Sequence, residues 1–324
     1  DGNAGTTDTP PAKGHLSDTD EGREFLWRKF EKIRSKWEKK FGGIMLAYFN
    51  KAESELISKL SAERTSAFHT EKQLDAGSLL FDLAQFFEYY RGLLGDAVTL
   101  SMIEAFDDFV RENSLGDMIL VPYDPSVVNV HARLMAKTST VPETLKDALQ
   151  KEIERGISLG ESSTELATRI RGYFRDSSPS SSLRVARTTS TASVNYGNYI
   201  AAKKAKVFTH KRWITQRDGR VRNTHRSMDG VLVRMDEKFR LPNGDTLEVP
   251  GDPEGRAESV IKCRCVASFK IERKSESAQE SAEAAKKENK LEFDKIHGEM
   301  EHVLDLIKKT TPTVNIVQPE KRER

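Results

Sequence analysis

Apolar side chains recur at helical spacing through the first third of the chain. Steps of three and four residues place them on one face of a helix, with charged side chains on the other face. Four such stripes can be followed, at Leu26, Phe30, Ile33, Trp37 and Phe41, at Met45, Phe49, Ala52, Leu56 and Leu60, at Leu79, Leu83, Phe86 and Tyr90, and at Val98, Met102, Phe106 and Phe109. Gly42-Gly43 is expected to separate the first two helices, and Gly92 and Gly95 to allow a break between the last two. The aromatic residues in these stripes predict helix core rather than a cofactor site.

Prolines and glycines mark the ends of the next predicted helix. Residues 121–125 contain two prolines and predict a connector. Pro142 fits the first turn of a helix, where its missing N–H has no helical partner. Gly156 and Gly160 are expected to end that helix.

A capping box and a serine-rich stretch follow. Ser162 and Glu165 have the spacing at which two side chains cap each other's backbone N–H, which predicts a helix start. Residues 177–182, around Pro179, predict a short linker. Another helix is expected over residues 183–205.

The pattern then changes to the period of two that is typical of strands. Val231, Val233 and Met235 alternate with Leu232 and Arg234, and Asn243-Gly244 predicts a tight hairpin between residues 239–241 and 247–249. A last strand is expected over residues 263–271. It would place one set of side chains on a single face: Cys263, Cys265, Ala267, Phe269 and Ile271.

These patterns predict an α+β protein, with an extended helical N-terminal region followed by a small α+β module with an antiparallel sheet. We expect a disordered tail at 1–20, a helical region at 21–176, the compact module at 183–274, and a charged helix and tail at 275–324. The chain has 324 residues, 37% hydrophobic and 31% charged. No run of 18 uncharged apolar residues occurs, so no membrane span is predicted, and residues 1–14 do not resemble a secretory signal.

Positive charge is concentrated in the compact module. Residues 183–274 hold 20 Lys and Arg against 10 Asp and Glu, although the whole chain carries only +2. Such an excess is suited to nucleic-acid phosphate, but it also fits a solvated basic face, because no aromatic ladder accompanies it. The arginines expected to contact DNA phosphate or an acidic protein partner are Arg212, Arg217, Arg220, Arg222 and Arg226.

The order of motifs in this module resembles a known family. An Ala-Arg-Thr helix starts at Ala186 and is followed by Trp213, then by an Asp-x-Arg-x-Arg-x-x-His segment from Asp218 to His225. A Pro-Gly-Asp turn at 250–252 and the sequence Cys-Arg-Cys at 263–265 complete the pattern. Together these motifs resemble the phage Mu F-like head-morphogenesis family of minor head proteins.

The resemblance implies a structural protein of the phage head rather than an enzyme. It implies a minor capsid or head-morphogenesis protein of a tailed bacteriophage, inside the prohead and later the virion head near the portal, after assembly in the host cytoplasm. The expected partners are the portal protein, a scaffolding or major capsid protein, and double-stranded DNA bound without sequence specificity, with no membrane partner. The family motif often places an acid after Ala-Arg-Thr. Here Thr189 stands in that position, which removes a candidate catalytic carboxylate.

The resemblance also implies a metal site at His225, Cys263 and Cys265. Residues two apart on a strand point to the same face, so both thiolates could reach one ion, and zinc is the cofactor this ligand set suggests. The candidates for a fourth ligand are Asp218, His210 and Asp252. The alternative is that both cysteines are reduced core residues, since free Cys behaves as a small hydrophobe. A disulfide between two such close cysteines would be strained, which suits a reducing compartment.

Two further functions remain open from the sequence. A metal-dependent nuclease or hydrolase acting on nucleic acid could use His225, Asp218 and the cysteines, although paired carboxylates are scarce in this region. Asp218 could instead cap a helix over residues 220–228. An effector delivered to the host is the third possibility, but the segment after Lys274 is small and poor in aromatic residues.

Overall fold

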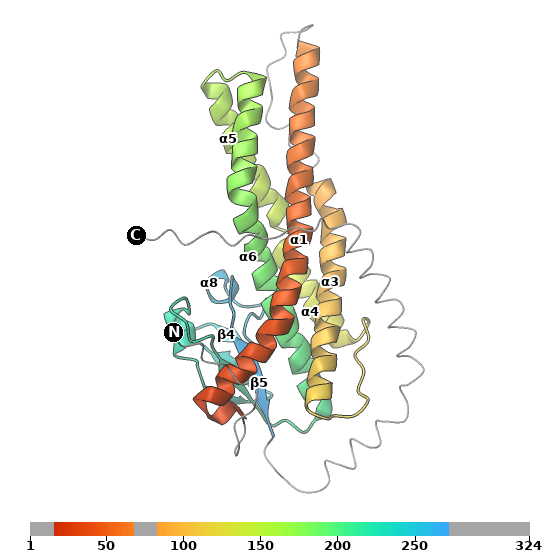
Figure 1. Cartoon of the computed structure of the whole chain (residues 1–324), viewed down its shortest axis with the longest axis vertical. Helices are drawn as coiled ribbons and strands as arrows, with labels where there is room; N and C mark the ends of the chain where they lie inside the picture. Colours follow the sequence, from red (N-terminus) through yellow and green to blue (C-terminus); the bar gives the residue numbers. More distant parts are fainter. Residues whose placement is uncertain (1–15, 68–82, 272–324) are drawn as a thin grey trace, which may run out of the picture. The chain divides into compact units, whose positions relative to one another are not determined.

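The computed structural model describes residues 16–67 and 83–271 (Figure 1). The fold class is α+β, as predicted: long helices dominate the N-terminal part, and a small antiparallel sheet lies in the C-terminal part. The predicted helix and tail at 275–324 lie outside the described residues. No described helix combines the length and apolar character that crossing a membrane requires.

The long helices carry most of the described chain. They are α1 (Asp20–Ala67), α3 (Leu83–Glu112), α4 (Pro125–Thr138), α5 (Val141–Ser158) and α6 (Ser163–Ala205). Figure 1 shows α1, α3 and α6 as unbroken coils.

The predicted break at Gly42-Gly43 is wrong, because α1 runs through both glycines. A glycine in a helix interior costs about 1 kcal/mol relative to alanine. Phe41, Ile44 and Met45 flank the pair and are fully buried. Burying each such side chain contributes about 2 kcal/mol, which more than offsets the glycine cost.

The predicted break at Gly92 and Gly95 is wrong in the same way, since α3 is continuous through both. Leu94 and Ala97 are fully buried beside them. Burial of one helix face again outweighs the local preference of glycine for other conformations.

The ends of α5 follow the predicted signals. Pro142 lies in the first turn of the helix, and Gly160 has a φ of +71° just beyond its end. Gly156, by contrast, lies within the helix. The connector predicted at 121–125 is confirmed up to Asp124, but Pro125 already opens α4, a helix that was not predicted.

The capping box at the start of α6 is confirmed. The Ser162 backbone N–H donates to Glu165 Oε2 at 2.8 Å, and the Glu165 N–H donates to Ser162 Oγ at 3.3 Å. Each side chain therefore satisfies a backbone donor that has no partner within the helix.

The linker predicted at 177–182 is wrong, because α6 continues through Pro179 without a break. Proline removes one backbone hydrogen bond from the helix. The Ser177 and Ser180 hydroxyls turn back onto backbone carbonyls of the same helix, at 2.7 Å from Tyr173 O and 3.0 Å from Ser177 O. Ser178 and Ser182 are buried, so this serine-rich stretch includes one packed face.

Two small antiparallel sheets follow α6. The three-stranded sheet has the order β2 (Leu232–Arg234), β1 (His210–Ile214), β5 (Val266–Lys270), and Trp213 pairs with Ala267. The predicted hairpin is confirmed as β3 (Phe239–Arg240) and β4 (Thr246–Leu247), with Gly244 at a φ of +82° in the turn. Only glycine adopts that conformation without strain.

The last strand is shorter than predicted. Strand β5 begins at Val266, so Cys263 and Cys265 lie in the segment before it, and Ile271 lies beyond it and is exposed. The expectation of a single strand face from Cys263 to Ile271 is therefore wrong. Both cysteines are nevertheless buried.

The predicted tail at 1–20 is wrong for its last five residues. Residues 16–18 form a short 3-10 helix, η1 (Leu16–Asp18), and α1 starts at Asp20. The Asp18 carboxylate pairs with Arg212 at 2.7 Å and with Lys270 at 3.1 Å. Contacts to residues far along the chain decide the structure here. Residues 1–15 lie outside the described part.

The described residues form two compact units. Unit 1 comprises residues 16–37, 98–133 and 187–271, and unit 2 comprises residues 38–67, 83–97 and 134–186. The predicted boundaries at 176 and 183 remain a prediction. One core cluster of unit 1 surrounds the two thiols, and its members are Trp213, Met228, Phe239, Leu241, Leu247, Val260, Cys263 and Cys265.

Candidate metal centre

Three buried side chains of unit 1 bring potential metal ligands together. His225, Cys263 and Cys265 each offer one ligand atom, and these atoms all lie within 4.8 Å of one another. His225 Nδ1 is 3.7 Å from Cys263 Sγ and 3.5 Å from Cys265 Sγ. All three residues are at most 3% exposed. The residues predicted as the core of a metal site are therefore adjacent.

Local backbone geometry turns the two thiols toward the histidine. His225 lies on the single-turn helix α7 (Asn223–Arg226), and the Trp213 ring packs 5.2 Å from its imidazole, centroid to centroid. The cysteines follow α8 (Ala257–Val260) and Lys262, whose φ is +56°. A non-glycine residue rarely adopts this left-handed conformation, so the turn before Cys263 is held by its surroundings.

Helix α6 supplies that support. Thr188 Oγ1 accepts a hydrogen bond from the Lys262 N–H at 3.0 Å, and the Thr191 hydroxyl donates to the Cys263 carbonyl at 2.6 Å. Positions 188, 191 and 195 follow one helix face. The cysteine segment is therefore fixed by side chains of a helix some 70 residues earlier.

Asn195 completes this face. Its amide donates to Pro250 O at 2.9 Å and to Cys265 O at 3.0 Å, and its carbonyl oxygen accepts from the Ala267 N–H at 3.0 Å. One buried side chain thus joins the 250–252 turn, the cysteine segment and the start of β5. This role was not predicted, because no local pattern marks an asparagine that bonds so far along the chain.

The distances fit a tetrahedral zinc. With Zn–S of about 2.3 Å and Zn–N of about 2.05 Å, a tetrahedral angle separates the sulfur and nitrogen ligands by about 3.6 Å. The two measured separations, 3.7 and 3.5 Å, lie on either side of that value. The same separations and the burial also fit reduced core thiols that are hydrogen-bonded to His225, so both interpretations of the cluster stay open.

The surroundings shift the pKa values of the two thiols in opposite directions. The pKa of Cys263 is lowered well below its usual range, mainly by a hydrogen bond with Cys265 and also by one with His225. The pKa of Cys265 is raised, mainly by burial and also by Cys263. Binding a divalent cation through both sulfurs would release the protons that they carry.

The candidates for a fourth ligand are not part of this group. The Asp218 carboxylate forms an ion pair with Arg264 at 3.0 Å. It also accepts a hydrogen bond from the Arg220 backbone N–H at 3.0 Å, which stabilises a local turn. The prediction that Asp218 caps a helix over 220–228 is wrong, because the helix there is only α7 and Arg222 holds its N-cap position.

The other two fourth-ligand candidates also have different roles. Asp252 is fully buried, where its carboxylate accepts the Glu248 and Glu254 N–H groups at 2.8 and 3.0 Å and lies 3.5 Å from Arg133. His210 lies at the start of β1, and its Nδ1 is 2.9 Å from Thr209 Oγ1. Among the described residues, the cluster of ligands therefore has three members.

A small cavity adjoins two of the three ligands. Its volume is about 20 Å³, and it is lined by Gln216, Arg220, Val221, Arg222, His225, Lys262, Arg264 and Cys265. A cavity of this size holds about one water molecule. Gln216 was not predicted as a site residue, and nothing in its sequence context distinguishes it.

The five predicted contact arginines fall into two groups. Arg212 donates to Ser17 O at 2.8 Å and pairs with Asp18, and Arg217 pairs with Asp20 and Asp229 at 2.7 Å each. These two side chains join η1 and α1 to the sheet module. Their charges are neutralised within unit 1, which makes them weak candidates for phosphate contact.

The other three arginines are arranged differently. Arg222 donates to the Ile261 carbonyl and is half-buried. Arg220 and Arg226 are exposed, and no ion pair to either is found among the described residues. Lys262, also exposed, lines the same cavity as Arg220. Of the five predicted arginines, the two that are exposed and outside any described ion pair therefore lie in the same segment as His225.

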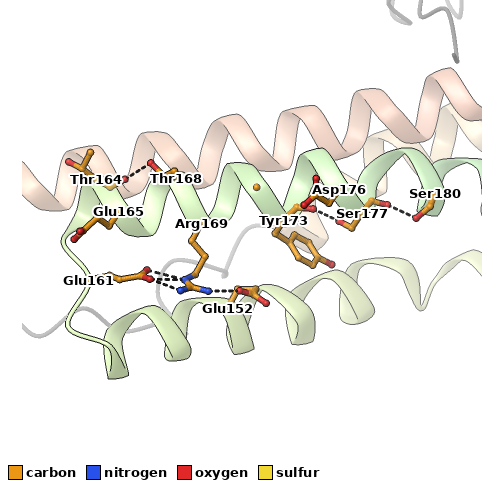
Figure 2. Close-up of a pocket in the computed structure, with 11 residues that line it drawn as sticks. Glu152, Glu161, Thr164, Glu165, Thr168, Arg169, Tyr173, Asp176, Ser177 and Ser180 are labelled. Carbon is orange, nitrogen blue, oxygen red and sulfur yellow. Dashed lines mark hydrogen bonds and ion pairs between the residues drawn. The ribbon is translucent and has the colours of Figure 1, made fainter. Parts of the chain in front are cut away.

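Unit 2 contains a larger groove between α5 and α6, of about 910 Å³ (Figure 2). Figure 2 shows Glu152 and Glu161 directed at Arg169, at 3.1 Å for Glu152 and 2.9 Å for Glu161. These pairs link the two helices and the loop between them. None of the predicted site residues lines this groove.

Comparison with known proteins concerns the region that contains the candidate metal centre. Residues 147–268 match the family described as Phage Mu protein F like protein. Over 122 residues the chain is 30% identical to "Minor head protein GP7" of Bacillus phage SPP1. That similarity covers 37% of this chain and 39% of the relative, so the chain spans about two fifths of the relative's length. No solved structure matches the chain. The predicted resemblance is therefore confirmed: residues 147–268, which include His225, Cys263 and Cys265, form a Phage Mu protein F-like region.

Proposed function

We propose that this chain is a minor head protein of a tailed bacteriophage and takes part in head morphogenesis. The observation that carries the proposal is the match of residues 147–268 to the Mu F-like family and to a relative named as a minor head protein. The matched region holds all of α6 and the three clustered ligands. The protein would be a component of the virion, inside the head.

The proposed partners are the portal protein and a scaffolding or major capsid protein. Assembly would take place in the host cytoplasm, with this chain carried into the prohead beside the portal. The test is to co-express the chain with the portal protein of the same phage, purify through a tag on the portal, and repeat the purification at several salt concentrations. Association with the portal or with procapsids supports the proposal. Failure to associate with either at every salt concentration contradicts it.

We further propose that the exposed basic side chains near the metal centre contact packaged DNA without reading its sequence. Arg220, Arg226 and Lys262 are the exposed cations there, whereas Arg212 and Arg217 are engaged within unit 1. The measurement is the affinity for double-stranded DNA as a function of salt. Each cation that no longer binds a phosphate should reduce the slope of log K against log salt by about 0.9. Arg220→Gln with Arg226→Gln should therefore flatten the slope. An unchanged slope, or a preference for one DNA sequence, contradicts this assignment.

The three-ligand cluster is proposed to hold zinc and thereby to stabilise the fold. His225 Nδ1 and the two cysteine sulfurs would be the ligands, and the ion would tie α7 to the segment before β5. Metal analysis of protein purified without added metal should give about one zinc per chain, lost in Cys263→Ser. Chelation should lower the thermal midpoint of the wild type. A metal-free protein whose stability is unaffected by chelator would support reduced core thiols instead.

A metal-dependent nuclease is the alternative function, and the cavity next to the ligands argues against it. Its lining includes four basic side chains and Gln216 but no carboxylate, and the lining residue that could act as a general base, His225, is assigned to the metal in this proposal. Asp218, the nearest candidate in sequence, pairs with Arg264. Incubation with plasmid DNA and Mg²⁺, Mn²⁺ or Zn²⁺ tests the alternative. Cleavage that disappears in His225→Ala would establish the enzyme.

A further inference from the structure

The cavity beside His225 and Cys265 suggests what completes the metal centre. We propose that the fourth coordination position stays open to an exchangeable small ligand in this cavity, and that the surrounding cations make the position selective for anions. This inference rests on the zinc part of the proposed function. It adds a binding position for an external ligand to the three protein ligands of the zinc proposal.

The first argument is the number of protein ligands. A tetrahedral ion needs four donors, and structural zinc sites normally take all four from the protein, whereas three-donor sites leave a position for an external ligand. The described residues supply three. Asp218 and Asp252 are engaged by Arg264 and by backbone N–H groups, so neither is available as the fourth.

The second argument is the space beside the ligands. The cavity of about 20 Å³ touches two of the three ligand residues. That volume exceeds the roughly 10–15 Å³ that a water-sized ligand requires. Arg220 and Lys262 line the cavity and are exposed, so a ligand can exchange with solvent along their side chains.

The third argument is two unsatisfied polar atoms. Gln216 Oε1 and His225 Nε2 are buried and have no hydrogen-bond partner among the described residues, and both residues line the cavity. Buried polar atoms without a protein partner are usually satisfied by water or a ligand. A water molecule in the cavity could donate to Gln216 Oε1. His225 Nε2 lies on the far side of the ring from Nδ1, so its partner would be a separate water and not the ligand of an ion held at Nδ1.

The fourth argument is charge. Arg220, Arg222, Lys262 and Arg264 are half of the lining residues. Asp218 offsets Arg264, and within the described cluster zinc with two thiolates and a neutral histidine carries no net charge. The remaining positive side chains therefore favour an anion over a neutral ligand at this position.

Cobalt substitution tests the proposal on the full-length chain. The reduced protein is loaded with Co²⁺ under argon and titrated with azide at constant ionic strength, while absorption is recorded. Thiolate-to-cobalt charge-transfer bands in the near ultraviolet report both cysteines, and the visible bands report coordination number and the fourth ligand. We expect azide to shift the visible bands saturably while the charge-transfer bands persist.

Two arginine variants provide a matched comparison. Arg220→Gln removes a charge that lines the cavity, and Arg226→Gln removes an exposed charge that lies in the same segment but outside the lining. Azide affinity should fall by about threefold or more in R220Q, because one nearby charge is removed, and should stay at the wild-type value in R226Q. Equal affinities in the two variants would overturn the assignment of the position to this cavity.

The outcomes separate this inference from the zinc proposal beneath it. Charge-transfer bands with no azide effect would mean a closed site, which overturns the open position and leaves the metal centre intact. Loss of the charge-transfer bands during titration would mean that azide displaces the metal or a cysteine, which also overturns it. Absence of the bands from the start would overturn the metal centre itself.

Discussion

At the residue scale, Asn195 shows how one side chain can organise a distant segment. It makes three buried hydrogen bonds to residues 55 to 72 positions later. Asn195→Ala leaves two carbonyls and one N–H without that partner, so we expect the free energy of unfolding to fall by about 3 kcal/mol or more. Urea unfolding measures the decrease.

Asn198 is the control for that substitution, because it lies one turn further along α6 and is only half-buried. Asn198→Ala should change the unfolding free energy by about 0.5 kcal/mol or less. Under the zinc proposal, the Asn195 variant should also retain less metal, since the Cys265 carbonyl is released. Equal stability of the two variants would show that Asn195 does not hold the cysteine segment.

The sequence predicted the site residues correctly only where they belong to a family motif. His225, Cys263 and Cys265 belong to a recognisable pattern, and the structure brings them together. Asp218, Arg212 and Arg217 were chosen for charge and nearness in sequence. Their actual partners are Arg264, Asp18 and Asp20, the last two nearly 200 residues away, and no local pattern identifies pairs at such separations.

At the element scale, Gly197 marks a close approach of α6 to α3. A Cβ at this position would lie 2.3 Å from the Met102 carbonyl oxygen, which is backbone and cannot move aside cheaply. Gly197→Ala should therefore destabilise the protein by about 1–3 kcal/mol. Gly172→Ala is the control on the same helix, because its nearest neighbour, Arg175 Nη2, would be 3.9 Å away.

The control should change stability in the opposite direction. Alanine is favoured over glycine within a helix by about 1 kcal/mol, so Gly172→Ala should raise the thermal midpoint. If both alanine variants raise it, α6 and α3 do not approach each other as closely as described.

Pro179 gives a test of whether α6 is continuous. Replacing this interior proline by alanine restores the backbone hydrogen bond to the Arg175 carbonyl. Alanine also gives the unfolded chain more conformational freedom, which opposes folding. The expected net effect is a rise of about 1–2 kcal/mol in the free energy of unfolding. Pro142→Ala is the contrast, because Pro142 is buried in the first turn of α5, where no backbone hydrogen bond can be gained. Pro142→Ala should therefore not raise the free energy of unfolding. A neutral or destabilising Pro179→Ala would instead support a linker at 177–182.

Local signals predicted local structure and failed where packing decides. The capping box at Ser162 and the hairpin at Asn243-Gly244 depend on neighbouring residues, and both were confirmed. Gly42-Gly43 and Pro179 also carry strong local signals, yet α1 and α6 run through them. Burial on one helix face contributes more than these residues cost, and that contribution depends on partners the local pattern does not contain.

At the scale of the whole molecule, ion pairs set how stability responds to acid. Hydrogen bonding from Arg169 lowers the pKa of Glu161 from its usual value of 4.5, and Arg217 lowers that of Asp20 from 3.8. A carboxyl whose pKa is lower in the folded state adds stability above its unfolded value and loses it as pH falls through the folded value. The thermal midpoint should therefore decline below about pH 4.5.

Glu161→Gln should remove part of that decline, because the neutral amide does not titrate. Glu154→Gln is the control on α5, since the Glu154 carboxylate accepts from the Gln150 amide rather than from an arginine. Thermal midpoints at several pH values between 3 and 6 measure both variants. A pH profile of Glu161→Gln that matches the wild type would show that this pair makes no contribution.

The fold class followed from the change of hydrophobic period along the chain, from helical to alternating, and it was confirmed. The composition of the compact units could not be predicted in the same way. Unit 1 combines three separate stretches, and the contact of Trp27 Nε1 with the Arg264 carbonyl at 2.8 Å is one of the pairs that join them. Hydrophobic period identifies elements but not which distant elements pack together.

That contact has a consequence for biosynthesis. Trp27 and Asp18 leave the ribosome well before Arg264 and Lys270, their partners 237 and 252 residues further along. At a translation rate of about 5–20 residues per second, the interval is on the order of 10–50 seconds. Throughout that time Trp27 and Asp18 lack these two partners. A ribosome stalled between these points would therefore hold a nascent chain in which unit 1 is incomplete, open to capture by chaperones or to premature association with other nascent chains.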